Sequence, residues 1–257
     1  MDKGRKKDMG KRILIAVPVN EQEKIFKEYL ISINSLKIPE GYTVDKFFIL
    51  SKDSPLSSML EPNEYTYENQ NFIIDKEQGF HNWSQERLIN IAMLRSLILE
   101  KARKEKYDYL FTVDSDILLH PNTLIHLLNY NLPIVTEAVW TKNPDGITVL
   151  DGQYEGWKHF QNRDYKKPGL YEINWGGMVT LIHSFIFNIE TINYYPIKEV
   201  IGEYSEDWSF FCKIYCHFPD FKLYMDTTYP GRHLYNESCY KRWMKDKENI
   251  NFNEKYS

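Results

Sequence analysis

The chain has 257 residues, of which 42% are hydrophobic and 26% are charged. This length and composition suit one globular domain with a large core and exclude large-scale disorder. The 32 Lys and Arg residues against 36 Asp and Glu give a net charge of -4. That balance argues against a domain that binds nucleic acid through a basic surface. The aromatic share of 15% suits core packing first, and a surface that grips sugars or bases second.

Cysteine usage and the length of the apolar segments both bear on where the protein acts. Cys212, Cys216 and Cys239 are too few for a disulfide framework and indicate packing residues in a reducing compartment. No apolar run reaches the roughly 18 residues of a membrane span, and the N-terminus has no signal-peptide core. We therefore expect a cytoplasmic protein with no transmembrane segment.

The first half of the chain alternates strands and helices. Residues 12–17 form an apolar run ended by Pro18, which predicts a buried strand. Asn20 is expected to cap the following helix, which runs to about Ser35. The same patterns predict, in order, strands at 46–50 and 71–74, a helix from Ser84 to about Lys104, and a strand at 109–113. This alternation predicts an α/β fold with a mostly parallel, Rossmann-like sheet flanked by helices on both faces.

Beyond a strand at 133–136 the pattern becomes less regular. Residues 141–175 mix Gly, Asp, Asn, Lys and aromatics, and we interpret them as an insertion or a hairpin that faces the substrate. Further strands are expected at 178–187 and 221–225, with a helix at 207–216 between them.

Three polar residues each follow a predicted strand, namely Asn20, Asp53 and Asp114. Parallel sheets bind ligands beyond the carboxyl ends of their strands, so these residues are expected to meet at one edge. Asp114-Ser115-Asp116 is the strongest local signal there. Its two carboxylates repel each other in a low dielectric unless a cation shares them, and hard oxygen ligands suit Mg²⁺ or Mn²⁺. The alternative is an ordinary acidic turn.

Three weaker signals lie further along the chain. Glu206-Asp207 opens a helix, where a carboxylate either complements the helix dipole or deprotonates a hydroxyl group. Gly176-Gly177 allows either a close approach of the backbone to a ligand or a tight turn. His233 stands alone after the last strand, where a structural role competes with that of a metal ligand.

In chain order, these segments resemble a GT-A-type nucleotide-sugar glycosyltransferase, close to the family-2 type. The resemblance covers roughly residues 12–233 and rests on segments 16–21, 48–54, 107–116, 176–182, 203–212 and 232–233. Residues 87–97 also look like the helix that precedes Asp-x-Asp in fungal mannan-polymerase-type subunits. The resemblance implies a single GT-A-like domain at 12–236, between a basic flexible tail (1–11) and a charged C-terminal extension (237–257).

By the same resemblance, the enzyme transfers a sugar from a nucleotide-diphosphate sugar, UDP-sugar favoured, to an acceptor hydroxyl. The residues implied for the donor are Pro18, Val19, Asn20, Glu21, Asp53, Arg87, Arg95, Asp114 and Ser115. Those implied for Mn²⁺ or Mg²⁺ are Asp114, Asp116 and His233. Arg95 lies on the apolar stripe of its helix, so it suits a buried, paired structural arginine equally well.

Asp207 matches the general base of inverting members of this class. Residues implied to border the acceptor are Trp175, Gly176, Gly177, Glu206 and Trp208. The acceptor stays open among a glycan, a lipid-linked intermediate, a protein and a modified nucleobase.

Two other classes of protein compete with this interpretation. A haloacid-dehalogenase-type phosphotransferase also has Asp-x-Asp after an apolar strand, but near its N-terminus and followed by Thr or Val where this chain has Leu118. A non-catalytic glycan-binding module would use the aromatic residues, and it leaves Asp114, Asp116 and Asp207 without a task.

Overall fold

The computed structural model describes residues 10–68, 85–142, 148–151, 153–154, 158–159, 167–197 and 206–249. Within these ranges, no helix combines the length and the apolar composition needed to cross a bilayer. Two predicted features lie outside the described residues: the strand at 71–74, and residues 202–205 just before Glu206.

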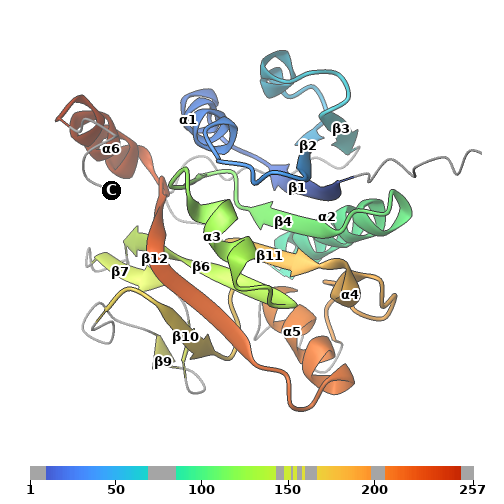
Figure 1. The fold of residues 1–257 in the computed structure, drawn as a ribbon. Coiled ribbons are helices and arrows are strands. Elements are labelled where there is room, and N and C mark those ends of the chain that lie inside the picture. Colours follow the sequence, from blue (N-terminus) through green and yellow to red (C-terminus); the bar gives the residue numbers. More distant parts are fainter. Residues whose placement is uncertain are drawn as a thin grey trace, which may run out of the picture.

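A central sheet organises the molecule, with its strands in the order β10-β12-β6-β11-β4-β1-β2-β3 (Figure 1). The parallel N-terminal part consists of β1 (Lys11–Val19), β2 (Tyr42–Ser51), β3 (Tyr65–Glu68) and β4 (Tyr109–Val113). The remaining strands of this path are β6 (Ile134–Lys142), β10 (Leu170–Ile173), β11 (Val179–His183) and β12 (Leu223–His233). Only β11 and β10 run against the others on this path, which confirms the expected mostly parallel sheet.

Two short strands pair with β12 and β6 of the sheet. β5 (Ile117–Leu118) pairs with β12, and β7 (Thr148–Asp151) forms an antiparallel pair with β6. β8 (Gln153–Tyr154) and β9 (Lys158–His159) form a separate two-stranded ribbon. The irregular stretch expected at 141–175 is therefore partly hairpin.

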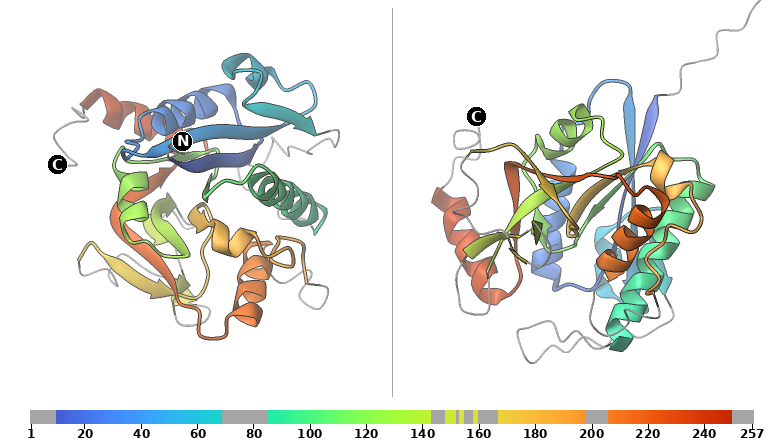
Figure 2. Two further views of the ribbon diagram at one scale, coloured as in Figure 1. Left: turned by 45° about the vertical axis from the view of Figure 1, so that its right-hand side comes forward. Right: turned by 90° about the horizontal axis from the view of Figure 1, so that it is seen from below.

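Helices cover both faces of the sheet because successive strand residues point to opposite sides. Ile13, Ile15 and Val17 of β1 pack with α1 (Glu23–Asn34) and α3 (Thr123–Asn129). Leu14 and Ala16 pack with α2 (Gln85–Lys104), α4 (Ser184–Phe187) and α5 (Glu206–His217) on the other face. Figure 2 shows α2 and α5 side by side on that second face. The predicted two-sided cover is confirmed.

The structure corrects four details of the predicted elements. β1 continues through Pro18 to Val19. The pairing of β1 with β4 ends at Ile15, so β4 does not need the backbone N–H that Pro18 lacks. The cap expected at Asn20 is wrong, because α1 begins at Glu23 and its N-cap is Gln22.

The third correction concerns the strand expected at 178–187. Only Val179–His183 forms β11, and the rest is the short helix α4. The Nδ1 atom of His183 accepts a hydrogen bond from the Phe185 N–H and so caps α4. β12 is also much longer than the predicted 221–225.

Two smaller elements complete the described fold. A 3₁₀ turn, η1 (Pro55–Met59), follows β2, and α6 (Glu237–Asn249) follows β12. α6 packs on α1, where Trp243 Nε1 donates to the Glu28 carboxylate at 2.9 Å and Lys247 Nζ lies 2.8 Å from it. The C-terminal segment thus includes a helix docked on the sheet domain.

A buried acid pair lies between the sheet and α3. Glu137 of β6 and Asp226 of β12 are register neighbours, and both are buried. Asp226 accepts hydrogen bonds from Tyr130, from the Thr228 backbone and hydroxyl, and has His126 Nδ1 at 2.7 Å. Glu137 accepts one bond from the Ala138 N–H, and its Oε2 atom finds no partner in the described structure.

Glu137→Gln is expected to stabilise the protein, and more so at pH 8 than at pH 5. Burial, and then the Asp226 carboxylate, raises the pKa of Glu137 well above its usual value. Glu137 therefore keeps its proton in the folded chain, whereas it loses the proton above about pH 4.3 in the unfolded chain. Glu137 thus lowers the free energy of unfolding progressively as the pH rises above about 4.3. Each kcal/mol gained raises Tm by about 2–4 °C at this size. Thermal unfolding at both pH values tests this, and an equal Tm change at both would contradict it.

Candidate active site

The three polar residues that follow strands lie at one edge of the sheet, as predicted. β2, β1 and β4 are parallel neighbours, and they lead into Asp53, Asn20 and Asp114 respectively. The backbone around Asp114 is held firmly: its N–H donates to Met178 O at 2.7 Å, and the buried Tyr29 hydroxyl donates to Val113 O at 3.2 Å. The end of β4 is therefore a fixed platform for the Asp-x-Asp segment.

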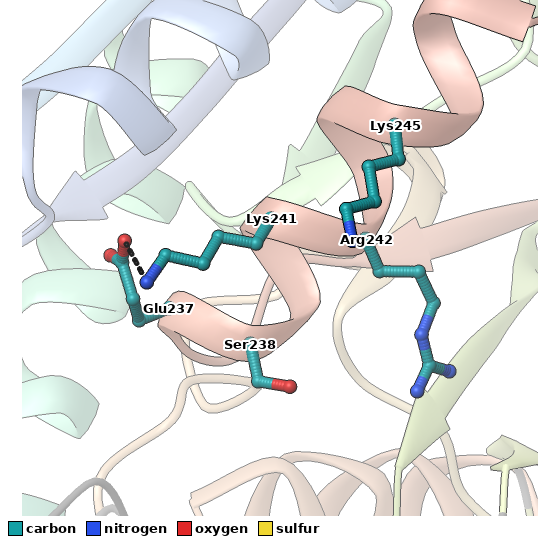
Figure 3. Close-up of a pocket in the computed structure, with 5 residues that line it drawn as sticks. All are labelled: Glu237, Ser238, Lys241, Arg242 and Lys245. Atoms are coloured by element: carbon teal, nitrogen blue, oxygen red, sulfur yellow. Dashed lines mark ion pairs between the residues drawn. The ribbon is translucent and has the colours of Figure 1, made fainter.

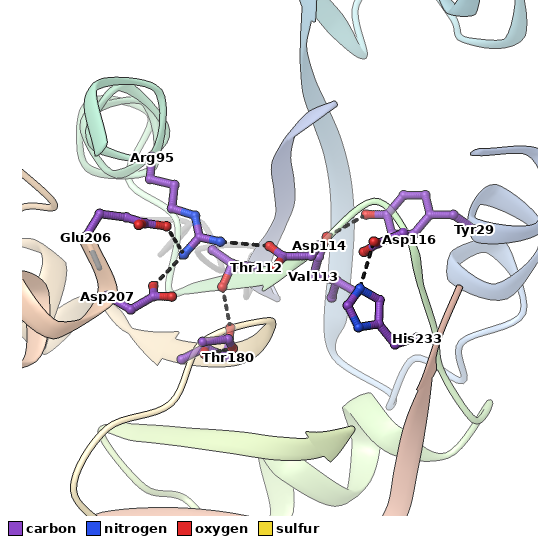
Figure 4. Close-up of polar contacts among 11 residues, drawn as sticks. Tyr29, Arg95, Thr112, Val113, Asp114, Asp116, Thr180, Glu206, Asp207 and His233 are labelled. Atoms are coloured by element: carbon purple, nitrogen blue, oxygen red, sulfur yellow. Dashed lines mark hydrogen bonds and ion pairs between the residues drawn. The ribbon is translucent and has the colours of Figure 1, made fainter. Parts of the chain in front are cut away.

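Arg95 of α2 joins the Asp-x-Asp segment to the start of α5 (Figure 4). Its Nη2 atom donates to Asp114 Oδ1 at 2.9 Å. Its Nη1 atom contacts Asp207 Oδ1 in a short hydrogen bond and lies 3.2 Å from Glu206 Oε1. Two segments that are distant in sequence are thus brought together by one guanidinium group.

The carboxylates around Arg95 outnumber it, and their burial changes their acidity. Burial is the main cause that raises the pKa of Asp114 to about 6 and that of Glu206 to about 7, while Arg95 opposes both shifts. Burial also raises the pKa of Asp207, again against the pull of Arg95. Glu206 Oε2 is buried and meets no hydrogen-bond partner in the described part of the chain. A carboxylate poised near neutral pH suits proton transfer.

Gly177 makes room for Asp207. A Cβ atom built on Gly177 would overlap Asp207 Oδ2, far inside a normal contact. The predicted Gly-Gly segment therefore does allow a close approach, but to the Asp207 side chain of the protein and not to a ligand. Gly176 is also tight, because its Cβ would lie 3.0 Å from Thr136 Cγ2.

Asp116 and His233 form the second polar contact of the site. His233 Nε2 lies 2.8 Å from Asp116 Oδ2, as Figure 4 shows. The pairing of β5 with β12 puts His233 opposite Ile117, and the Leu234 N–H donates to Asp116 O at 2.8 Å. The backbone therefore fixes this pair as firmly as the side chains do.

Glu21 and Arg87 belong to the same electrostatic neighbourhood. Burial, and then the charges of Asp116 and Asp114, raises the pKa of Glu21 to about 9, and Arg87 opposes that shift. The first loop and the N-terminal part of α2 therefore face the Asp-x-Asp segment. This part of the site has more carboxyl groups than cationic groups, and a bound cation would reduce the repulsion between the carboxylates.

The donor set suits a hard divalent cation in part. Among the described residues, no three His, Cys, Asp or Glu side chains are grouped closely enough to hold a metal by themselves. Asp116 and His233 supply two adjacent donors, and Asp114 Oδ1 is bound to Arg95. Mg²⁺ is commonly held by one or two carboxylates together with substrate phosphates and water. The residues present thus fit a cation whose shell a diphosphate completes.

The other predicted site residues differ in how they face this edge. The Val19 side chain is buried in the core, which leaves only its backbone for a ligand, while Pro18 is half-buried beside it. Asp53 is exposed in the turn after β2 with a φ of 61°. Ser115 is buried between its two aspartates.

Two aromatic residues were expected to border the acceptor. Trp175 packs against the core, and its buried indole N–H has no partner within the described ranges. Trp208 is half-buried one residue after Asp207. Both lie next to the Gly177–Asp207 contact in sequence.

Two residues that sequence reasoning missed support the site. Tyr29 anchors the end of β4 from α1, and Tyr194 lies 5.7 Å from the Arg95 guanidinium across its ring face. Tyr29 has the spacing of an ordinary core residue, and Tyr194 follows an irregular stretch, so neither carried a local signal.

A cavity of about 530 Å³ lies on α6 (Figure 3). The described residues that line it are Glu237, Ser238, Lys241, Arg242 and Lys245. None of these belongs to the Arg95 or Asp116 contacts, so we do not assign this cavity to the active site.

Comparisons with known proteins agree with the geometry. A solved structure of S. aureus TarS 1–349 in complex with UDP matches with a TM-score of 0.50 and 14% identity, over 84% of this chain and 60% of that one. This likeness concerns the fold alone, and it bears out the GT-A architecture expected from the sequence.

Two curated relatives are described as glycosyltransferase 25 family members. One, from Aedes aegypti, is 29% identical over 113 residues, which cover 43% of this chain and 18% of the relative. The other, from Anopheles gambiae, is 26% identical over 133 residues, which cover 51% of this chain and 22% of the relative. The matched part of the chain thus spans about a fifth of the length of these relatives.

The fold and the comparisons define a domain of the GT-A glycosyltransferase class. The model of glycosyltransferase family 25, N-terminal domain, matches residues 52–198, more than half of the chain, and the chain therefore belongs to this family. The resemblance to the family-2 type thus identified the class, and the family within it is family 25. The haloacid-dehalogenase alternative loses its support.

Proposed function

We propose that this chain is a metal-dependent glycosyltransferase that moves a sugar from a UDP-sugar to an acceptor hydroxyl with inversion at the anomeric carbon. One observation carries the proposal: Arg95 links Asp114 of the Asp-x-Asp segment directly to Asp207. A donor site and a proton acceptor must lie side by side for a direct displacement, and these two carboxylates do. A glycan-binding module, by contrast, has no use for three carboxylates around one arginine.

The donor is assigned to the sheet edge that begins at Pro18 and ends at Asp116. Rossmann-like sheets bind nucleotides beyond the carboxyl ends of their strands, where Asn20, Asp53 and Ser115 lie. UDP is favoured because the TarS structure with a similar fold is a complex with UDP. Arg87 lies near Glu21 at this edge and offers a cation for the diphosphate.

A divalent cation, Mn²⁺ or Mg²⁺, is assigned to Asp116 and His233, with Asp114 beside them. When bound, it supplies positive charge next to the diphosphate leaving group. His233 must be neutral to bind a metal, so its Nε2 atom would give up the hydrogen bond that it shares with Asp116 Oδ2.

Asp207 is assigned as the general base. Its carboxylate is held between Arg95 and the Gly177 backbone, at the start of α5. It would take the proton of the acceptor hydroxyl as that oxygen attacks the anomeric carbon, which inverts the configuration. Glu206, Trp175, Gly176 and Trp208 would border the acceptor around this point.

Thermal unfolding with UDP, GDP, CDP or dTDP, each with and without Mn²⁺, tests the donor assignment. A ligand at 100 times its Kd adds about 2.7 kcal/mol to stability. In a chain of this size that raises Tm by roughly 5–11 °C. We expect this shift with UDP and Mn²⁺ together. The absence of a metal-dependent shift with every nucleotide would count against the proposed function.

Gly177→Ala is expected to lower turnover at least about tenfold while the protein stays folded, because an added methyl group must displace Asp207. A displacement of about 1 Å at a catalytic group costs on the order of a hundredfold in rate. Gly169→Ala is the control: it lies at a half-buried bend with a φ of 157°, so it adds backbone strain, but nothing lies within 4 Å of the added Cβ. Turnover is measured as UDP release from a UDP-sugar. Equal rates for Gly177→Ala and wild type would show that Asp207 need not keep this position.

A further inference from the structure

We propose that Arg95 is a positioning residue that fixes Asp207 and Glu206 relative to Asp114, and that it does not bind the donor diphosphate. The inference rests on the proposed function where it treats Asp207 as the base. It reassigns a residue that the resemblance placed among the ligands of the nucleotide sugar.

The contacts of the guanidinium carry the proposal. Its two terminal nitrogens are both occupied, Nη2 by Asp114 at 2.9 Å and Nη1 by Asp207 and by Glu206 at 3.2 Å. The planar fork of an arginine suits this arrangement, because it holds carboxylates on two sides at fixed angles. A lysine ammonium is a single point charge and cannot span both sides.

The surroundings of Arg95 are built to keep it still. Only 13% of its side chain is exposed. Tyr194 lies under the guanidinium, and the Tyr194 N–H is held by Ser96 Oγ at 3.1 Å. α2 itself is fixed in the core through Ala92 and Leu99, one turn to either side. A side chain held from all sides suits positioning better than capture of a mobile ligand.

The charge of the cluster points the same way. Three carboxylates surround one guanidinium, so a diphosphate brought to Arg95 would meet more negative than positive charge. Removing Arg95 would leave the buried Glu206 carboxylate and the half-buried Asp207 and Asp114 carboxylates without a cation, which is unfavourable. Because the three compete for that cation, removing one of them should relieve part of the loss.

The experiment compares Arg95→Met, Arg95→Lys, Asp207→Asn and Arg95→Met/Asp207→Asn with wild type. Arg103→Met is the matched control, because Arg103 lies on the same helix, bonds to Phe187 O at 2.7 Å and is remote from the cluster. Calorimetry measures the Kd of UDP with Mn²⁺. UDP release from UDP-glucose and UDP-galactose, with water as the acceptor of the sugar, gives kcat and KM, and thermal unfolding gives Tm.

We expect Arg95→Met to bind UDP within about threefold of wild type and to keep its KM, while kcat falls at least a hundredfold. Arg95→Lys recovers most of the Tm but less than a tenth of the kcat. Adding Asp207→Asn to Arg95→Met raises Tm above that of Arg95→Met alone. Arg103→Met keeps wild-type kcat and KM.

A tenfold or greater loss of UDP affinity in Arg95→Met, with kcat retained, would make Arg95 a diphosphate ligand and overturn the proposal. The proposal would also be overturned if the Tm of the double variant falls by the sum of the Tm losses in Arg95→Met and Asp207→Asn. If wild type binds no UDP and releases none, the proposed function fails, and the Tm comparison still decides whether Arg95 holds Asp207.

Discussion

Asp207→Asn is expected to lower the turnover of sugar transfer by about 10²–10⁴-fold, the usual contribution of a general base. Asparagine keeps the size of the side chain and an oxygen for Arg95, but it cannot take a proton from the acceptor. UDP affinity should stay within about twofold of wild type, because Asp207 lies on the α5 side of Arg95 rather than at the Asp-x-Asp segment. UDP release and calorimetry measure the two effects separately.

The matched control is Asp220→Asn, at an exposed position after α5. It should keep both turnover and UDP affinity. A loss of UDP binding in Asp207→Asn would move this residue from the acceptor side to the donor site. Turnover retained within tenfold would remove it from the base role, and Glu206, whose free oxygen is buried beside it, would be the next residue to replace.

Asp116→Asn is expected to abolish the Mn²⁺-dependent part of UDP binding and to lower turnover at least about a hundredfold. Hard divalent cations prefer anionic oxygen, and a neutral amide lowers the charge of an already small donor set. The variant should fold, since the amide can still accept a hydrogen bond from His233. In wild type, UDP and Mn²⁺ together are expected to raise Tm by roughly 5–11 °C.

In Asp116→Asn the Tm shift should be no larger with Mn²⁺ than without it. His233→Gln should weaken the metal-dependent shift as well, because it removes the second donor. Asp220→Asn serves again as the control that keeps the full shift. A wild-type Mn²⁺-dependent shift in Asp116→Asn would place the metal elsewhere.

The sheet edge could be predicted because its signals are local. Residues 109–113 are apolar apart from Thr112, and the structure gives β4 the same bounds. Parallel strands then required Asn20, Asp53 and Asp114 to share one edge. The 178–187 run is mostly apolar, which favoured one long strand, but its polar residues His183 and Ser184 stand where β11 ends and α4 begins.

The contacts within the site could not be predicted, because they join distant parts of the chain. Arg95 and Asp207 are separated by 112 positions, and sequence reasoning left the arginine equally suited to diphosphate binding and to a buried pair. Glu137 and Asp226 meet only through the register of β6 and β12. Asn20 failed as a cap because β1 runs on through Val19 and delays the start of α1.

A crystal structure of the protein soaked with UDP and Mn²⁺ tests the central claim most directly, with anomalous scattering to locate the metal. We predict a manganese peak between Asp116 and His233, a diphosphate beside it, and Arg95 still bound to Asp114 and Asp207. UDP bound elsewhere, for example in the cavity on α6, or a metal without contact to Asp116, would contradict the account.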